Sequence, residues 1–392
     1  MKHLGYCTNI HPGESWSEVR DNLRDHVLAV KARVSPNERF GVGLRLSARA
    51  AQELRRRKQL EALVQFLAEN DLYVFTINGF PYGAFHGGRV KEDVYRPDWL
   101  EDPRLDYSDL LAELLVAMLP ADVDMGTVST VPGAFKPRAT SFEDREDIAE
   151  RLIAHAAKLC MLEDRTGKRI TLALEPEPCC LLETVSESIA FFHAHLFTSA
   201  RVAHFANASG RSRGDAEEAL RRHLGICFDA CHMAVEFENM EAALDAYARA
   251  GICVPKAQIS AGLELPAEAS LEALARFDEP VYLHQVVEER DDTLIRYVDL
   301  GEAIEASRDR RGRWRVHFHV PLFHEVFEGE LASTRPETAE LLHLLGGDRR
   351  ETPHLEVETY TWDVLPAEYR ALDIDDAIAR ELTWARSELD KS

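Results

Sequence analysis

The sequence lacks the features of a membrane or exported protein. No apolar run approaches the ~18 residues that a membrane-spanning helix needs, and residues 1–6 contain no long apolar segment of an export signal. Cysteine is scarce, with seven residues and no Cys-x-x-Cys spacing of the zinc-binding kind. We therefore expect no membrane insertion and a reducing, cytoplasmic location.

Basic residues are too few to balance the acidic ones. The chain has 46 Lys and Arg residues against 68 Asp and Glu residues, which gives a formal net charge of −22. This charge repels a phosphate backbone, so nucleic acid is not an expected partner. The short basic run over residues 55–58 lies in a helical pattern, and we interpret it as a solvated helix face.

Three common catalytic signatures are also missing. The sequence contains no Gly-x-x-x-x-Gly-Lys phosphate loop, no Gly-x-Gly-x-x-Gly after a strand and no Gly-x-Ser-x-Gly turn. Nucleotide cofactors and serine-based hydrolysis are therefore not indicated. Cys179 and Cys180 are adjacent, and we interpret them as small buried side chains rather than as reactive thiols.

Strand-like and helix-like patterns alternate along the chain, which predicts an α/β protein with a parallel sheet and crossover helices. Eight strands are predicted, over residues 3–9, 40–47, 72–79, 125–130, 170–175, 224–229, 254–260 and 355–360. They predict a (β/α)8 TIM barrel that occupies residues 1–392 as a single domain. One predicted helix covers residues 50–69, and Thr-x-x-Glu capping boxes at Thr184 and Thr334 predict two helix starts.

Two segments exceed the length of a minimal barrel. Residues 80–105, rich in Gly, Pro and aromatic residues, follow the third strand and are predicted to form a lid or pocket wall. Residues 281–323 interrupt the path from strand seven to strand eight and predict a β-rich insertion. We expect two strands around a turn at Asp291 and Asp292, a short helix, and a strand over residues 314–320, packed on the barrel rim.

Acidic side chains stand at the carboxyl ends of three predicted strands, where a parallel β/α barrel keeps its chemistry. Glu175 ends the fifth strand, Asp229 ends the sixth, and Glu358 lies near the end of the eighth. The side-chain period of two points each of them inward. A hard divalent cation could bind these carboxylates, and His232, three residues after Asp229, could be a ligand or a substrate contact.

Strand seven offers Gln258 where a metal site would normally have an imidazole or a carboxylate. Gln258 is a weak oxygen donor, so His319 is an alternate ligand, with His317 on the same face of its strand. Lys256, His317, His11 and His284 are further candidate substrate contacts. Glu356 shares a face with Glu358, and we interpret it as a supporting acid. Four other histidines are interpreted as structural: His155, His193, His195 and His223.

Over nearly the whole chain, these segments resemble the xylose-isomerase-like barrel superfamily, which includes sugar isomerases, ketose epimerases and relatives of endonuclease IV. The most specific match runs from Asp229 to Glu236 (Asp-Ala-Cys-His-Met-Ala-Val-Glu) and is similar to the Asp-x-x-His-Met segment of ketose epimerases. The resemblance implies that Glu175, Asp229 and Glu358 are metal ligands. It implies a fourth ligand, a histidine, at the position of Gln258.

Three further runs resemble ebo-type metabolite-traffic proteins, which accompany secondary-metabolite gene clusters. They are residues 8–14 (Thr-Asn-Ile-His-Pro-Gly-Glu), 316–321 (Val-His-Phe-His-Val-Pro) and 356–362 (Glu-Val-Glu-Thr-Tyr-Thr-Trp). This resemblance implies a role in a secondary-metabolite pathway.

The first functional hypothesis is a metal-dependent isomerase or epimerase for a sugar, sugar phosphate or cyclitol-like metabolite. A divalent ion (Mn, Zn, Mg or Co) would polarise a carbonyl and a hydroxyl, and the resemblance suggests Glu175 and Glu358 as the groups that move the proton. A second hypothesis is a metal-dependent hydrolase, although an amidohydrolase would carry its His-x-His on the first strand. A third is a non-catalytic binding or traffic protein, consistent with Gln258. The sequence leaves the oligomeric state open.

Overall fold

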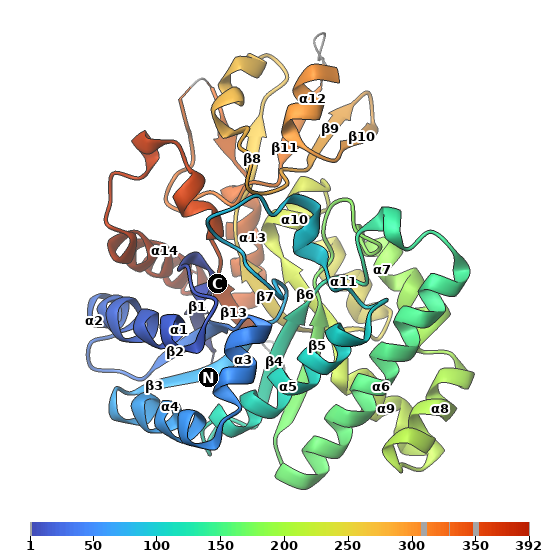
Figure 1. Cartoon of the computed structure of the whole chain (residues 1–392). Helices are drawn as coiled ribbons and strands as arrows, with labels where there is room; N and C mark the ends of the chain where they lie inside the picture. Colours follow the sequence, from blue (N-terminus) through green and yellow to red (C-terminus); the bar gives the residue numbers. More distant parts are fainter. Residues whose placement is uncertain (1, 307–311, 329, 348–352, 392) are drawn as a thin grey trace.

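Eight parallel strands form the centre of the computed structural model, which describes residues 2–306, 312–328, 330–347 and 353–391 (Figure 1). Neighbouring strands follow chain order, and an isolated bridge between Cys7 and Gly43 joins the two edges, so the sheet curls into a barrel. All eight predicted strands and the predicted TIM barrel are confirmed. The strands are β1 (Leu4–Tyr6), β2 (Phe40–Arg45), β3 (Leu72–Asn78), β4 (Met125–Thr130), β5 (Arg169–Leu174), β6 (Leu224–Asp229), β7 (Cys253–Ile259) and β13 (His354–Val357).

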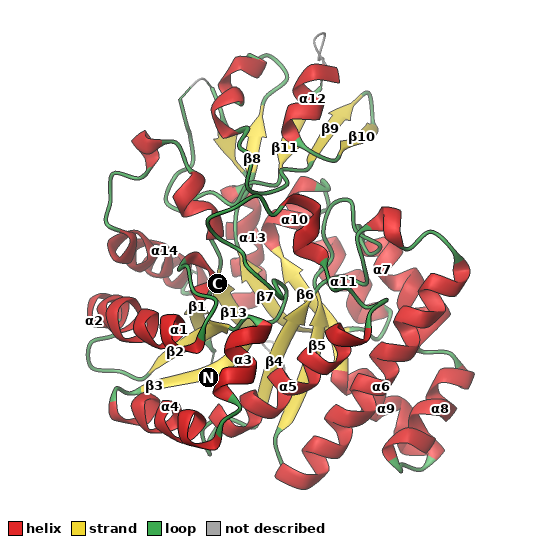
Figure 2. Ribbon diagram, viewed as in Figure 1, coloured by secondary structure: helices red, strands yellow, loops and turns green. Residues whose placement is uncertain are grey.

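Helices surround the barrel (Figure 2). Their buried apolar residues form one hydrophobic core with those of the strands. The helices are α1 (Trp16–Asn22), α2 (Leu28–Val34), α3 (Ala48–Leu54), α4 (Arg57–Glu69), α5 (Asp102–Met118), α6 (Phe142–Thr166), α7 (Val185–Phe191), α8 (Ser199–Ser209), α9 (Arg213–His223), α10 (Ala230–Val235), α11 (Met240–Arg249), α13 (Arg335–Gly346) and α14 (Ile374–Leu389). The helix α12 (Leu300–Ala306) lies on the insertion sheet instead (Figure 1). Of the helices in the described ranges, none is long and apolar enough to span a bilayer.

Two helix predictions need correction. The predicted helix over residues 50–69 is broken into α3 and α4, because the backbone of Arg56 is extended (φ −63°, ψ 119°). The capping box at Thr184 forms, whereas the one at Thr334 does not, although α13 does begin at the next residue. The Thr334 hydroxyl instead accepts a hydrogen bond from the backbone N–H of Gly262 (2.8 Å), and Glu337 pairs with Arg315.

Several polar side chains inside the barrel contact one another. The Thr127 hydroxyl donates to Oγ1 of Thr76 (2.8 Å) and lies 3.0 Å from Nδ1 of His354. Above them, Nζ of Lys256 lies 2.6 Å from Oε2 of Glu356, and both side chains are fully buried. Gly43 makes room for this pair, since a Cβ there would lie 1.9 Å from Oε1 of Glu356.

The insertion before β13 is an antiparallel sheet, above the barrel in Figure 1. Its strands, in spatial order, are β10 (Thr293–Tyr297), β9 (Val286–Arg290), β11 (Arg313–Val316), β8 (Leu263–Leu265) and β12 (Ala332–Ser333). The predicted turn at Asp291 and Asp292 is present, with both residues at positive φ (47° and 58°). The sheet also contains β8 and β12, which lie outside the predicted bounds of 281–323.

The chain leaves the insertion sheet earlier than the sequence predicts. The strand expected over residues 314–320 ends at Val316, after which His317 to Val320 continue without strand structure. The backbone N–H of Val320 donates to the carbonyl of Ala261 (2.8 Å), just beyond β7. This path lays His317 and His319 over the carboxyl ends of the barrel strands.

The segment between β3 and α5 also reaches over the strand ends. It appears in Figure 1 as the teal loop that runs toward the insertion. The backbone N–H groups of Val90 and Lys91 both donate to the carbonyl of Val281 (2.8 and 2.9 Å). These bonds connect the β3–α5 loop to the insertion. The predicted loop range of 80–105 ends inside α5, which begins at Asp102.

Candidate metal and substrate site

Three carboxylates converge at the carboxyl ends of β5, β6 and β13. Glu175, Asp229 and Glu358 each place one oxygen within 4.8 Å of an oxygen of the other two. Their exposures are 2%, 0% and 4%. Oε2 of Glu175 and Oδ2 of Asp229 have no hydrogen-bond partner among the described residues. Buried, unpaired carboxylates are costly, so this cluster needs either protons or a cation.

The electrostatics of the cluster support that conclusion. Burial, followed by repulsion from Glu358 and Asp229, raises the pKa of Glu175 well above its ordinary value. Burial, followed by repulsion from Asp229 and Glu356, does the same to the pKa of Glu358. A divalent cation would reverse this effect, because it favours the ionised form of every carboxylate beside it.

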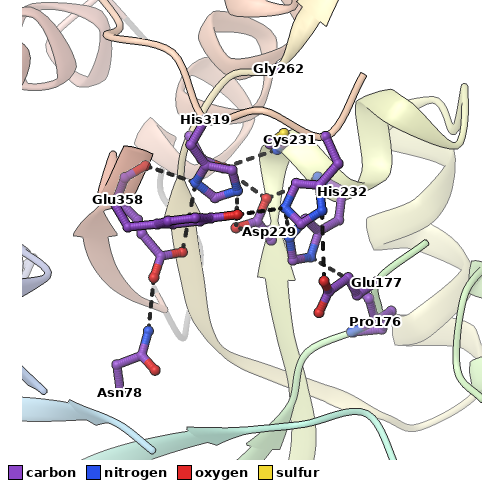
Figure 3. Close-up of polar contacts among 12 residues, drawn as sticks. Asn78, Pro176, Glu177, Asp229, Cys231, His232, Gly262, His319 and Glu358 are labelled. Carbon is purple, nitrogen blue, oxygen red and sulfur yellow. Dashed lines mark hydrogen bonds and ion pairs between the residues drawn. The ribbon is translucent and has the colours of Figure 1, made fainter. Parts of the chain in front are cut away.

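Two asparagines hold Glu358 in place. The side-chain amides of Asn9 and Asn78 both donate to Oε1 of Glu358 (2.7 and 2.8 Å), as Figure 3 shows for Asn78. Oδ1 of Asp229 is fixed in a similar way, by the backbone N–H of His232 (2.9 Å) and the hydroxyl of Ser260 (2.8 Å). Sequence reasoning missed both asparagines, although Asn78 lies at the carboxyl end of a predicted strand.

His319 stands between two of the carboxylates (Figure 3). Its Nε2 lies 4.0 Å from Oδ2 of Asp229, and its Nδ1 lies 4.0 Å from Oε2 of Glu358. Nδ1 donates to the backbone carbonyl of Glu358 (3.0 Å), so Nε2 carries a lone pair, and that atom has no partner in the described structure. Burial lowers the pKa of His319 to about 4, which keeps the ring neutral and able to bind a metal.

Gln258 is the candidate ligand on β7. It is in register with Asp229 on one side and with Glu356 on the other, and it does not line the cavity described below. Its side-chain amide is fully buried, and neither the oxygen nor the nitrogen has a hydrogen-bond partner among the described residues. The chain therefore presents two candidates for a fourth ligand, an imidazole above the carboxylates and an amide beside them.

Two further imidazoles face each other across the site. Nδ1 of His232 donates to the carbonyl of Pro176 (2.9 Å), and Nδ1 of His317 donates to Oε1 of Gln285 (2.7 Å). With those protons assigned, the two Nε2 atoms present lone pairs to each other at 3.1 Å. A shared proton or a bound group relieves this contact.

Glu177 is a fourth buried acid at the site. The hydroxyl of Tyr95 donates to its Oε1 (2.7 Å), while its Oε2 has no partner in the described ranges. Burial raises the pKa of Glu177 above its ordinary value. Sequence reasoning gave this residue no role, although it follows Glu175 by two positions in the same Glu-Pro-Glu run.

Most of these groups line one cavity. It is lined by Asn9, Asn78, Phe80, Pro81, Phe85, Lys91, Val94, Tyr95, Glu175, Glu177, His232, Tyr282, Leu283, His317, His319, Glu358 and Tyr360. Of the candidates from the sequence, the cavity thus brings together Glu175, Glu358, His232, His317 and His319.

Three predicted substrate contacts lie away from this cavity. His11 bonds to the hydroxyl of Tyr6 (3.0 Å) and stacks on His26. His284 donates through Nδ1 to the carbonyl of His317 (3.0 Å) and lies 2.8 Å from Glu279 through Nε2. Lys256 forms an ion pair with Glu356. All three side chains already have partners within the protein.

The remaining histidines and the cysteines take structural places. The four histidines set aside in the sequence each bond to a group outside the cavity: His155 to Asp109, His193 to Ala250, His195 to Glu146 and His223 to Ile170. None of the seven cysteines, all of which lie in the described ranges, is in a disulfide. Burial raises the pKa of Cys179 to about 12, which leaves little reactive thiolate.

Comparisons with known proteins place the fold. No family model matches the sequence, and no curated protein matches it. A solved xylose isomerase domain protein from Planctomyces limnophilus matches with a TM-score of 0.50 and 13% identity, over 100% of this chain and 99% of that one.

Two further solved structures match less closely in shape. A xylose isomerase-like TIM barrel protein from Mycobacterium smegmatis, in complex with magnesium, has a TM-score of 0.49 and 11% identity, over 100% and 97% of the two chains. The 3-keto-D-glucoside 4-epimerase of E. coli has a TM-score of 0.42 and 14% identity, over 99% and 100%. The architecture and the Planctomyces match together identify the fold of this chain as that of the xylose isomerase-like TIM barrels.

Proposed function

We propose that this protein is a metal-dependent isomerase or epimerase that moves a proton next to the carbonyl of a small polyhydroxylated metabolite. One observation carries the proposal: three buried carboxylates and the lone pair of His319 converge, with unpartnered atoms on Glu175, Asp229 and His319. Carboxylate oxygen together with imidazole nitrogen is a donor set that suits Mn, Zn or Co, and Mg through the carboxylates. The xylose isomerase-like fold is compatible with this chemistry by analogy alone.

Glu175, Asp229, Glu358 and His319 would hold the divalent ion, with Gln258 as the alternative fourth ligand. When bound, such an ion polarises a carbonyl and the neighbouring hydroxyl, which acidifies the intervening C–H. The asparagine bonds to Glu358 and the Ser260 bond to Asp229 would keep these ligands oriented.

Proton transfer is assigned to the two glutamates that flank the proposed metal site. One of Glu175 and Glu358 removes the proton from the carbon next to the carbonyl, and the other returns a proton on the opposite side. His232 and His317 offer their Nε2 atoms to substrate hydroxyls, and Glu177 offers its free Oε2. Aromatic rings above these groups exclude water from the reacting carbon.

The cellular setting is proposed from two observations. Seven cysteines without a disulfide among the described residues are typical of a reducing compartment, so we place the reaction in the cytoplasm. The resemblance of residues 8–14, 316–321 and 356–362 to ebo-type proteins favours a metabolite of a secondary pathway.

The first test is the metal content of protein purified without chelator. We expect about one divalent ion per chain in the wild type and loss of that ion in a Glu175→Ala, Asp229→Ala double variant. A Glu143→Ala, Glu150→Ala variant, which removes two exposed acids of α6, is the matched control and should keep the ion. Wild-type protein without metal would contradict the proposal.

The second test measures the reaction itself. Ketoses and keto-cyclitols are incubated with the protein in D₂O, and deuterium at the carbon next to the carbonyl is followed by NMR. Glu358→Gln should lower the exchange rate by about 10² to 10⁴ without unfolding the protein. Unchanged exchange in Glu358→Gln would rule out the assigned role.

A metabolite-binding protein without catalysis is a second candidate, and Gln258 favours it. A buried amide on β7 is a weaker ligand than the histidine that the family resemblance implies there. This candidate predicts that a ketose binds with measurable affinity while no deuterium enters the bound molecule.

A further inference from the structure

The unpartnered side-chain atoms at the floor of the cavity, among the described residues, are hydrogen-bond acceptors. Apart from the atoms assigned to the metal, the unpartnered polar atoms of the described lining residues are Oε2 of Glu177 and Oδ1 of Asn9. The Nε2 atoms of His232 and His317 are acceptors as well, because both Nδ1 atoms donate elsewhere, and Nε2 of His317 already accepts from the Tyr360 hydroxyl (3.4 Å). A ligand that matches this floor must bring donors, such as hydroxyl groups.

The opposite wall is aromatic. The rings of Phe85, Tyr282 and Tyr360 lie within contact of one another, with centroids 5.1 to 5.2 Å apart for the three pairs. They come from three distant parts of the chain: the β3–α5 loop, the insertion and the segment after β13. Phe80 and Tyr95 continue the wall, with ring centroids 5.7 Å apart.

The polar atoms of the wall are already engaged. The Tyr95 hydroxyl donates to Glu177 and accepts from Gln285 (both 2.7 Å), and the Tyr282 hydroxyl lies 3.1 Å from Nδ1 of His86. Lys91 is the one lysine or arginine that lines the cavity in the described ranges. Its Nζ is held by Asp299 (2.6 Å) and by the carbonyl of Glu279 (3.0 Å).

From this division we infer that the substrate is a neutral, unphosphorylated hydroxyketone that carries an apolar or aromatic ring, with its hydroxyl groups on the floor and its ring against Phe85, Tyr282 and Tyr360. The inference rests on the proposed function and narrows its substrate class.

The same contacts disfavour two other substrate classes. A phosphate group would enter a cavity that contains Glu175, Glu177 and Glu358, with Lys91 already paired. A free hexose has hydroxyls on all sides, and those against the aromatic wall would lose water without gaining a partner. Each such hydroxyl would weaken binding by about five-fold or more.

Three probes with the same hydroxyketone head separate these classes: 2-hydroxyacetophenone, dihydroxyacetone and dihydroxyacetone phosphate. Their dissociation constants are measured by calorimetry on the full-length protein, and the metal content of each sample is measured in parallel. We expect the phenyl probe to bind at least about ten-fold more tightly than dihydroxyacetone, and the phosphate to bind no better than dihydroxyacetone. Tightest binding of the phosphate, equal binding of the two neutral probes, or no binding of the phenyl probe would overturn the inference.

A variant that lacks one aromatic ring tests whether the aromatic wall provides the affinity for the phenyl probe. Phe85→Leu keeps an apolar side chain and should weaken the phenyl probe by about two- to ten-fold, while dihydroxyacetone binding stays unchanged. Phe142→Leu, at a residue of α6 that is 64% exposed, is the matched control and should change neither probe. An unchanged phenyl affinity in Phe85→Leu would also overturn the inference.

Failure of the proposed function gives a different result. Protein that contains no metal, yet binds the phenyl probe in a manner sensitive to Phe85→Leu, would reject the isomerase proposal and keep the substrate class. Protein that contains about one metal ion per chain and binds the phosphate probe most tightly would reject the substrate class and keep the isomerase proposal.

Discussion

Nε2 of His319 lies 4.0 Å from Oδ2 of Asp229, although His319 belongs to the segment that leaves the insertion and Asp229 ends a barrel strand. The insertion thus places an imidazole beside the carboxylates. The neighbouring strand β7 carries an amide, Gln258, and no imidazole at the position in register with Asp229. Two positions far apart in sequence are therefore alternatives for one ligand, and they can be separated by mutation.

His319→Ala should lower the affinity for a divalent ion by at least about ten-fold, because it removes the unpartnered imidazole nitrogen beside Asp229 and Glu358. Affinity is measured by titrating Mn²⁺ or Zn²⁺ into metal-depleted protein. Gln258→Ala should have a smaller effect, and His193→Ala, at an exposed histidine, should have none. A larger loss in Gln258→Ala than in His319→Ala would assign the ligand to β7 instead.

The two glutamates of the Glu-Pro-Glu run should respond differently to the same substitution. Glu175→Gln should lose the metal, since Glu175 groups with Asp229 and Glu358. Glu177→Gln should retain it, because Oε1 of Glu177 is held by Tyr95 outside that group. Elemental analysis of both variants checks the difference, and equal losses would place Glu177 among the ligands.

The buried pair of Lys256 and Glu356 should dominate the local stability of the barrel. Lys256→Met should lower the free energy of unfolding by about 3–5 kcal/mol, because it leaves Glu356 buried without a partner. The Lys256→Met, Glu356→Leu double variant should recover most of that loss. Denaturant unfolding of the single and double variants tests this, and equal stability of the two would contradict it.

An exposed ion pair provides the control for this cycle. Arg57 and Glu61 approach to 2.7 Å on α4, with side chains 90% and 61% exposed. Arg57→Met should leave the free energy of unfolding close to that of the wild type, since solvent screens the pair.

Glu381 should make stability depend on pH. Its carboxylate accepts from the backbone N–H of Leu322 (2.9 Å) and the hydroxyl of Thr359 (2.7 Å), and burial raises its pKa from 4.5 to about 7. The folded protein therefore favours the protonated form. The resulting stability is fully present below about pH 4.5 and is lost as the pH rises through 7.

Glu381→Gln mimics the protonated form and removes this dependence. Between pH 5 and pH 8, the free energy of unfolding of the wild type should fall by up to about 3 kcal/mol relative to that of the variant. This is the size expected from the pKa shift of Glu381. Thermal or denaturant unfolding across this range measures the difference. A difference that stays constant with pH, as expected for the exposed control Glu143→Gln, would contradict the assignment.

The barrel could be predicted from local patterns because each strand is short, apolar and followed by a helical period. The same patterns placed Glu175, Asp229 and Glu358, since a parallel barrel gathers the carboxyl ends of its strands at one face. Asn78 lay within reach of that rule and was missed. The helix break at Arg56 was not predictable, because neither glycine nor proline marks it.

The residues that surround the carboxylates depended on long-range packing. No local pattern shows that His319 lies beside Asp229 or that Lys256 forms an ion pair with Glu356. The same is true of the hydrogen bond from Tyr95 to Glu177. Each of these contacts joins elements that are far apart in sequence, and side-chain periodicity describes only one element at a time.

The sequence by itself determined the α/β barrel and the three acids at the ends of its strands, because backbone periodicity and strand direction are local properties of the chain. The tertiary structure alone decided which imidazole joins the acids, which polar groups are left without partners, and which rings face them. Those outcomes depend on how the insertion and the β3–α5 loop pack over the barrel, where contacts between distant segments satisfy some polar groups and leave others free to bind a ligand.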